Sequence, residues 1–546
     1  MAVSESLLQQ LFALTPLADA SPSVKAVSLV VVLPLLAVVL NVASQLLLPR
    51  PKNLPPVVFH YVPIIGSAVY YGIDPYKFFF ECRAKYGDVF TFVLLGRRIT
   101  VALGPKGSNL VFNAKHQQVT AEDAYTHLTT PVFGKEVVYD VPNAVFMEQK
   151  KFVKVGLSID NFRVYVPQIV DELTEYMRTD PRFAPFQKGQ STFSVDIFQA
   201  MSEVIILTAS RTLQGKEVRE GLDKSFAQLY HDLDSGFTPI NFVIPNLPLP
   251  SNFKRDRAQK KMSRFYQDIV AKRRAAGHSG ASDEEHDMIA ALMEQKYKNG
   301  RELSGVEIAH MMIALLMAGQ HTSSATGSWA LLRLASRPEV IEELWREQVA
   351  VYGESDGKLR ELDYETQKTS VPLLDAVVKE TLRLHPPLHS IMRYVKADLA
   401  VPATLAAPSS ARADASYVIP RGHYIMAAPG VSQVDPALWK SAESFDPHRW
   451  LDSATAAAMQ DSGEEQADFG FGMISTGANS PYLPFGAGRH RCIGEQFAYL
   501  QIGVIIATFV RAFKWQLESK FPDPDYQSMV VLPQKNGSKI TLTRRT

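Results

Sequence analysis

The longest helical pattern in the chain sets the scale of its fold. It lies in LSGVEIAHMMIALLMAGQHTSSATGSWALLRLASRP (303–338). Ser304 and Glu307 fit a capping box, in which each side chain satisfies a backbone N–H of the first turn. Pro338 makes Arg337 a natural end. A helix of about 30 residues spans roughly 45 Å, and the middle of this one is apolar nearly all round. It must therefore be buried, and it is long enough to cross a whole domain.

The centre of this helix carries a polar string that costs helical stability. Gly319, Gln320, His321 and Thr322 stand in AGQHTSS, where a glycine and several hydroxyls are unfavourable. One explanation is close helix packing against Gly319, with Thr322 bonded back to a carbonyl. The other is a functional role, and these residues alone leave both explanations open.

Length and charge limit the classes of protein to consider. A chain of 546 residues, 46% hydrophobic, can bury one very large core or two to three ordinary domains. Its net charge of +1 does not indicate a nucleic-acid partner. Two cysteines allow at most one disulfide, which favours a reducing compartment. The sequence contains no internal repeat, no phosphate-binding glycine loop and no dinucleotide-binding fingerprint.

The N-terminal region predicts a membrane anchor. Residues 26–48 form an uncharged apolar segment of the length that spans a bilayer as a helix. Residues 1–25 would be lumenal, with a possible amphipathic helix at 6–14. A proline-rich linker (49–56) follows, and its basic residues favour a cytosolic position for the large remainder, 57–546. A cleaved signal peptide is the rival interpretation, but the segment is longer than a typical signal core.

The remainder of the chain reads as mainly helical with a small sheet. A second helix is expected at 371–387, where Glu380 and Arg383 are three residues apart and so share one face. Flanking leucines and valines suggest that this pair is partly buried. Residues 88–103 predict two short strands, and residues 401–416 and 453–466 read as surface loops.

Cys492 stands in a glycine-rich loop just before an apolar helix, between Arg491 and Ile493. The helix dipole and the nearby basic residues Arg489, His490 and Arg491 predict a depressed thiol pKa. A thiolate is a nucleophile or a metal ligand. Zinc would require further ligands at zinc spacing, which are missing nearby. A single thiolate suits haem iron, whereas Cys82 in FFFECRAKYG reads as an inert core residue.

Four motifs together resemble the haem-thiolate monooxygenases, the cytochromes P-450. FGAGRHRCIG (485–494) resembles their cysteine-ligand loop, and Glu380 with Arg383 matches their Glu-x-x-Arg pair. FDPHRW (445–450) matches the segment whose arginine, here Arg449, completes a buried triad, and AGQHTSS matches the oxygen-binding segment. The resemblance runs from about Asn53 to the end. It implies a mainly α fold, a large helical domain with a small β-rich domain, preceded by one transmembrane helix.

Two histidines narrow the resemblance further. His490 and His321 replace an arginine and an acid found in most members, and both are similar to the sterol 14α-demethylases. The strings AYTHLTTPVFGKEVVYDVPN, MEQKKFVK and LDSGFTPINF are similar to that family too, and DFGFGMISTGANSPYLPFG resembles its fungal members.

The resemblance implies a role for each matching residue. Cys492 would be the axial ligand of haem b, and Glu380, Arg383 and Arg449 would brace the loop behind the haem. Thr322 would steer protons to dioxygen, with His321 and Asp234 as a proton path. The residues expected to bind the cofactor are Tyr125, Tyr139, Lys150, Arg393, Phe485, Gly486, His490, Ile493 and Gly494. Those expected to contact substrate are Phe133, Phe237, Gly319, Ser390 and Met529.

The implied reaction is three O2- and NADPH-dependent oxidations of the 14α-methyl group of lanosterol or its 24-methylene relative eburicol. The methyl leaves as formate, giving a 14,15-unsaturated sterol in ergosterol biosynthesis. The implied partners are a membrane-bound NADPH-dependent flavoprotein reductase, membrane lipid and azole inhibitors, at the endoplasmic reticulum membrane. Three alternatives stay open: a microsomal oxygenase for fatty acids or foreign compounds, an isomerase or dehydratase relative, and a non-enzymatic haem-binding scaffold.

Overall fold

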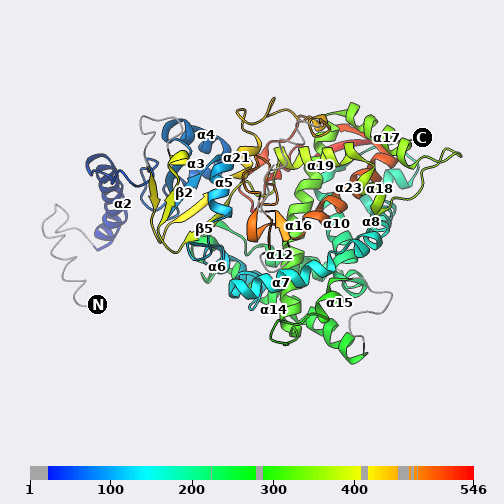
Figure 1. The fold of residues 1–546 in the computed structure, drawn as a ribbon, viewed down its shortest axis with the longest axis horizontal. Coiled ribbons are helices and arrows are strands. Elements are labelled where there is room, and N and C mark those ends of the chain that lie inside the picture. Colours follow the sequence, from blue (N-terminus) through cyan, green and yellow to red (C-terminus); the bar gives the residue numbers. More distant parts are fainter. Residues whose placement is uncertain are drawn as a thin grey trace.

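The long buried helix predicted from the sequence is the axis of the molecule. The computed structural model describes residues 22–222, 224–277, 287–406, 416–452, 466–468, 473–475 and 477–545. Helix α16 (Gly305–Ala335) runs through its centre (Figure 1). Its N-terminus has the predicted capping box, since Glu307 N–H donates to Ser304 Oγ at 3.1 Å and Ser304 N–H donates to Glu307 at 2.9 Å. Both predicted ends are confirmed to within two residues.

Helices surround α16 on most sides. Helices α8, α10 and α23 share one hydrophobic core cluster with α16, which includes the fully buried Trp329. A second cluster joins α16 to α7, α12, α14 and α15. The bounds of these and other principal helices are α3 (Ala68–Ile73), α4 (Pro75–Tyr86), α5 (Gly104–Phe112), α6 (Glu122–Phe133), α7 (Asn143–Gly156), α8 (Ile159–Thr179), α10 (Ile197–Ala209), α12 (Lys224–Asp234), α13 (Pro239–Val243), α14 (Pro250–Ala275), α15 (Met288–Met293), α17 (Pro338–Tyr352), α18 (Tyr364–Thr369), α19 (Pro372–Leu384), α21 (Pro429–Gln433) and α23 (Glu495–Ala512).

A five-stranded sheet lies at one end of the molecule, beside α4 and α5 (Figure 1). Its order is β1-β2-β8-β5-β3, with only β2 and β8 parallel. The strands are β1 (Val89–Leu94), β2 (Arg97–Ala102), β3 (Val119–Thr120), β5 (Ile391–Val395) and β8 (Tyr424–Ala427). The predicted hairpin at 88–103 is therefore confirmed as β1 and β2. A second sheet has the order β11-β14-β4, from Phe513–Leu517, Lys539–Arg544 and Thr192–Asp196.

One predicted loop is wrong in part. Residues 401–416 begin with the end of β6 (Leu399–Val401) and a short helix, α20 (Ala403–Ala406), because Val401 and Leu405 are apolar enough to join the core. Most of the loop predicted at 453–466 lies outside the described residues, and so does the amphipathic helix expected at 6–14. Gln466 itself begins strand β9 (Gln466–Asp468), which pairs with β10 (Met473–Ser475).

The apolar N-terminal segment forms helix α2 (Pro22–Leu47), which projects from the sheet end of the body (Figure 1). Its stretch Val30–Leu47 has a mean hydropathy of 2.3 and is long and apolar enough to cross a membrane. Two polar residues near its end contact the body. Asn41 and Gln45 donate side-chain N–H groups to the carbonyl of His60, at 2.8 and 2.7 Å. This helix fits a membrane anchor.

Candidate active site

A cavity of about 550 Å³ lies between α16 and the five-stranded sheet. Its walls are predominantly apolar, with a few polar groups, as is typical of sites for small apolar ligands. Helix α16 contributes Ala318, His321, Thr322 and Thr326 to one wall. The other walls come from α6, from segments 387–393 and 526–531, and from the loop around Cys492.

Cys492 lines this cavity with its thiol. The Cys492 residue is exposed, and it lines the cavity beside Phe485 and Gly486. Its backbone N–H donates to the Phe485 carbonyl at 2.9 Å, which closes the glycine loop. Burial raises the pKa of the Cys492 thiol, and the backbone N–H of Gly494 offsets this only partly. The predicted depressed pKa is therefore wrong for the protein alone, because desolvation outweighs the helix dipole.

Glycine is required at two positions of this loop. Gly486 and Gly488 have φ of +68° and +65°, in the left-handed region. A Cβ atom on Gly488 would lie 2.7 Å from the carbonyl oxygen of Phe112. The absence of side chains thus lets the loop pack closely against α5. Gly486 also lines the cavity beside Phe485.

Cationic and hydroxyl groups gather around the cavity near Cys492. Arg393 and His490 line it, together with Tyr125 and Tyr139, whose rings stack with centroids 5.6 Å apart. The Tyr125 hydroxyl accepts the Met392 N–H at 2.8 Å. Burial and the neighbouring Arg393 lower the pKa of His490 well below its usual value, so its ring is neutral at pH 7.

Lys150 lies behind this group rather than in the cavity wall. Its ammonium donates to the carbonyls of Arg489 and Arg491, at 2.9 Å each, and so ties α7 to the cysteine loop. Burial lowers the pKa of Lys150 to about 7. Ile493 and Gly494, also predicted to bind the cofactor, follow Cys492 directly but do not line the cavity.

These residues fit an anionic, planar metal macrocycle such as haem. The Nδ1 atom of His490 is buried without a hydrogen-bond partner among the described residues, which marks a place for a polar group. Arg393 is 4% exposed and forms no ion pair within the described part of the chain. No group of three or more His, Cys, Asp or Glu among those residues could hold a metal ion. The lone thiol therefore favours haem over zinc.

Two of the side chains expected to form a proton path, His321 on α16 and Asp234 on α12, lie in contact. His321 Nε2 lies 2.8 Å from Asp234 Oδ1. The Tyr230 hydroxyl, also on α12, lies 2.9 Å from the same nitrogen. Thr322 Oγ1 donates to the Ala318 carbonyl at 2.8 Å, which is the back-bonded arrangement considered from the sequence. Both His321 and Thr322 line the cavity, so local helix bonding does not remove them from it.

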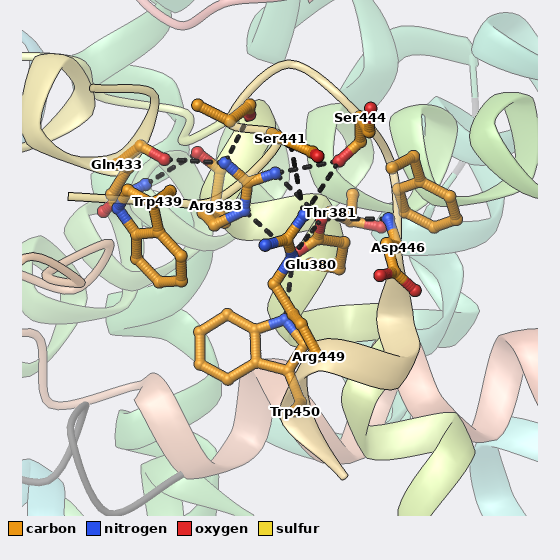
Figure 2. A network of polar contacts seen from close by, with 12 residues as sticks. Glu380, Thr381, Arg383, Gln433, Trp439, Ser441, Ser444, Asp446, Arg449 and Trp450 are labelled. Carbon is orange, nitrogen blue, oxygen red and sulfur yellow. Dashed lines mark hydrogen bonds and ion pairs between the residues drawn. The ribbon is translucent and has the colours of Figure 1, made fainter. Parts of the chain in front are cut away.

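Glu380, Arg383 and Arg449 form the buried triad expected from the sequence (Figure 2). Arg383 donates two hydrogen bonds to the Glu380 carboxylate, at 2.8 and 2.9 Å, and Arg449 Nε lies 3.1 Å from Oε1. The side chains of Glu380 and Arg383 are 0% exposed. Trp450 Nε1 donates to the remaining carboxylate oxygen at 2.9 Å. All of these polar atoms are satisfied, as burial of charge requires.

Gln433 links this triad to the cysteine loop, although no sequence motif marks it. Its carbonyl accepts from Arg383 Nη1 at 2.8 Å (Figure 2). Its side-chain oxygen accepts the N–H of Leu483 at 3.1 Å, two residues before Phe485. The triad thus braces the segment that leads into the loop.

The residues predicted to contact substrate reach the cavity, with one exception. Phe133 and Phe237 line it and face one another edge to face, with ring centroids 6.0 Å apart. Ser390 and Met529 line it as well, and Ser390 Oγ is 3.2 Å from the Tyr71 hydroxyl. Gly319 does not line the cavity; a Cβ placed on it would meet nothing within 4 Å.

Several cavity residues were missed because they are distant in sequence from any motif. Tyr71 on α3, Tyr526 on the 526–531 segment and His389 beside Ser390 meet in one aromatic cluster. Tyr230, which does not line the cavity, contacts His321 as described above. Only the spacing of Tyr230 and Asp234, four apart on one helix face, could have indicated that they act together.

Comparisons with known proteins agree with this arrangement. The family model described as Cytochrome P450 matches residues 55–540. A lanosterol 14-alpha demethylase of Mycosarcoma maydis is 83% identical over 99% of this chain and 97% of its own length. An eburicol 14-alpha-demethylase of Uncinula necator is 50% identical over 91% of this chain and 92% of its own. The structure of retinoic acid-bound cyanobacterial CYP120A1 is similar with a TM-score of 0.72 and 19% identity, covering 91% of this chain and 100% of that one.

Proposed function

The chain belongs to the cytochrome P450 family, among the lanosterol and sterol 14-alpha demethylases, and we propose that it removes the 14α-methyl group of lanosterol or eburicol. The methyl would pass through alcohol and aldehyde stages and leave as formate, giving a 14,15-unsaturated sterol. Each of the three oxidations would consume one O2 and two electrons. The observation that carries this proposal is a thiol and a Thr322–His321 pair that line the same apolar cavity.

The residues around Cys492 would hold haem b. The Cys492 sulfur would bind its iron, and a bound iron cation would favour the thiolate that burial alone disfavours. Arg393, His490 and the two tyrosines, 125 and 139, would donate to its propionates, with Lys150 behind the loop. When bound, the haem supplies activation of dioxygen and oxygen insertion into a C–H bond.

The chain itself would move protons and position the substrate. His321 lines the cavity, and its Nε2 lies 2.8 Å from Asp234. A proton that His321 gives up could therefore be replaced from solvent through Asp234, whose side chain is 38% exposed. Thr322 would hold a hydroxyl at the cavity face of α16. Phe133 and Phe237 would pack against the sterol rings and exclude water.

The chain requires an electron donor, because it has no flavin or nicotinamide motif. We propose a membrane-bound NADPH-dependent flavoprotein reductase in this role, at the endoplasmic reticulum membrane, with α2 as the single anchor and the body cytosolic. Residues 1–25 would then be lumenal and 49–56 the linker to the catalytic domain. Azoles, whose ring nitrogen can ligate iron, are proposed inhibitors.

The decisive experiment combines the purified full-length protein and a reductase with lanosterol and with eburicol, and follows formate and sterol products. Formate release that depends on NADPH and O2 is expected. Turnover of fatty acids alone, rearrangement without O2, or stable haem without any product would contradict the proposal and favour, respectively, the three alternative classes.

A further inference from the structure

Trp329 connects the helix that carries Thr322 to another segment of the cavity wall. It stands seven residues after Thr322 and three after Thr326, so the three share one face of α16. Thr322 and Thr326 line the cavity, whereas Trp329 is fully buried next to it. Its indole N–H donates to the carbonyl of Val531 at 3.0 Å.

Val531 is bonded on both sides and joins two segments of the cavity wall. Its carbonyl accepts from Trp329, and its N–H donates to the Pro387 carbonyl at 3.0 Å. Residues 387–393 and 526–531, which include Ser390 and Met529, form these segments. Met529, two residues before Val531, is 44% exposed, whereas Val531 is buried.

His385 fixes the orientation of the indole. The two rings stack with centroids 3.9 Å apart and planes 4° from parallel. His385 Nε2 accepts a hydrogen bond from Arg333 Nε at 2.9 Å, one turn further along α16. The Arg333 guanidinium also lies over the ring of Phe521, 4.2 Å from its centroid. A ring held by stacking and by a bonded neighbour has little freedom to rotate.

We infer that Trp329 is a positioning residue that sets the place of the 387–393 and 526–531 walls relative to Thr322. A sterol held between these walls would then present its reacting carbon at a distance from Thr322 that the rigid helix determines. The inference rests on the proposed sterol chemistry and adds to it a determinant of substrate position outside the cavity lining. Displacement of about 1 Å at such a site is enough to impair reaction.

The test compares two matched substitutions in the full-length, haem-loaded protein. Trp329→Phe removes the indole N–H but keeps an aromatic ring. Trp515→Phe is the control. Trp515, on β11, is also buried, and its indole N–H donates to the Leu331 carbonyl of α16 at 2.9 Å. Neither Trp515 nor Leu331 lines the cavity. Both should lower the melting temperature. Only Trp329→Phe should weaken sterol binding, by roughly 5- to 10-fold for one lost hydrogen bond.

Sterol affinity is measured from the absorbance change that sterol induces, and KM is compared with kcat. Equal sterol affinity in the two variants would overturn the inference. If Trp329→Phe does not fold, His385→Asn serves instead, because it removes the stacked ring but keeps an acceptor for Arg333; it should weaken sterol binding in the same direction. Wild-type protein that binds no sterol would overturn the proposed function itself.

Discussion

His321 on α16 and Asp234 at the end of α12 meet at 2.8 Å, although 86 residues separate them in the sequence. The contact places a charged or hydrogen-bonded pair between the cavity and solvent. The Tyr230 hydroxyl approaches the same nitrogen. One ring nitrogen cannot both donate to Asp234 and accept from Tyr230, so the tautomer of His321 decides which partner is engaged.

Loss of this pair should slow turnover more than it weakens sterol binding. We expect His321→Ala and Asp234→Asn each to reduce kcat on the order of 100-fold, the usual worth of a proton-transfer group. The measurements are kcat, the fraction of NADPH that yields product, and the rate ratio in H2O and D2O. Unchanged turnover and unchanged proton uptake in His321→Ala would rule out the path.

A matched control exists on the surface. His448 Nε2 lies 2.6 Å from Glu343 Oε2, and its side chain is 46% exposed. His448→Ala removes the same kind of contact at a pair that does not line the cavity. Since exposed pairs contribute little, kcat should stay within about twofold of wild type.

The two cysteines should respond in opposite ways to substitution. Cys492→Ser is expected to abolish the thiolate signature of the ferrous–carbonyl spectrum and all turnover. Cys82→Ser should keep both, because Cys82 is packed in the core beside the sheet, where burial raises its thiol pKa to about 12. Spectra of the two variants at equal protein concentration make the comparison. A normal thiolate spectrum from Cys492→Ser would contradict the ligand assignment.

Removal of Glu380 should be strongly destabilising. Glu380→Gln leaves Arg383 and Arg449 without their carboxylate inside the protein, and breaking a buried ion pair typically costs about 3–5 kcal/mol. Denaturant unfolding and the haem content after purification measure the effect. Lys379→Ala is the control on the same helix: it removes a 2.7 Å pair with Asp375 whose side chains are 36% and 47% exposed. Its expected cost is about 0–1 kcal/mol. Similar losses in both variants would contradict the bracing role.

Lowering the pH should remove the contribution of Glu307 to the stability of the fold. Burial alone would raise the pKa of the Glu307 carboxyl. The hydrogen bonds from Arg301, Ser304 and Tyr297 outweigh this effect and lower the pKa from 4.5 to about 2. A depressed carboxyl pKa stabilises the fold above pH 4.5, and the contribution is lost as pH falls toward 2. We expect Glu307→Gln to cost about 1.5–3 kcal/mol at pH 7, and the gap to wild type to shrink below pH 4.5.

Melting temperatures of both proteins between pH 7 and pH 3 test this. Glu302→Gln is the control, because the Glu302 carboxylate is 59% exposed and pairs with Lys296 at 3.0 Å. Its melting temperature should follow that of wild type. If the difference in melting temperature between Glu307→Gln and wild type does not change with pH, the carboxylate charge is not what stabilises the fold.

Local spacing was enough to predict the long central helix and the N-terminal apolar helix of this fold. The capping residues Ser304 and Glu307, Pro338, and the apolar run at 26–48 each act through neighbours within a turn or two. Helix α16 and helix α2 follow from them directly. The motif around Cys492 identified the family and the cofactor for the same reason: its chemistry is concentrated in ten consecutive residues.

Burial and contacts between distant segments were decided only by the tertiary structure. The sequence suggested a depressed pKa for Cys492 from its charged neighbours, but the surrounding protein removes water and reverses the direction. Gln433 and Trp329 carry no local signal, because each acts by bonding a segment 50 or more residues away. Spacing along the chain governs hydrogen bonds within a helix, whereas desolvation and long-range bonds depend on which surfaces come together.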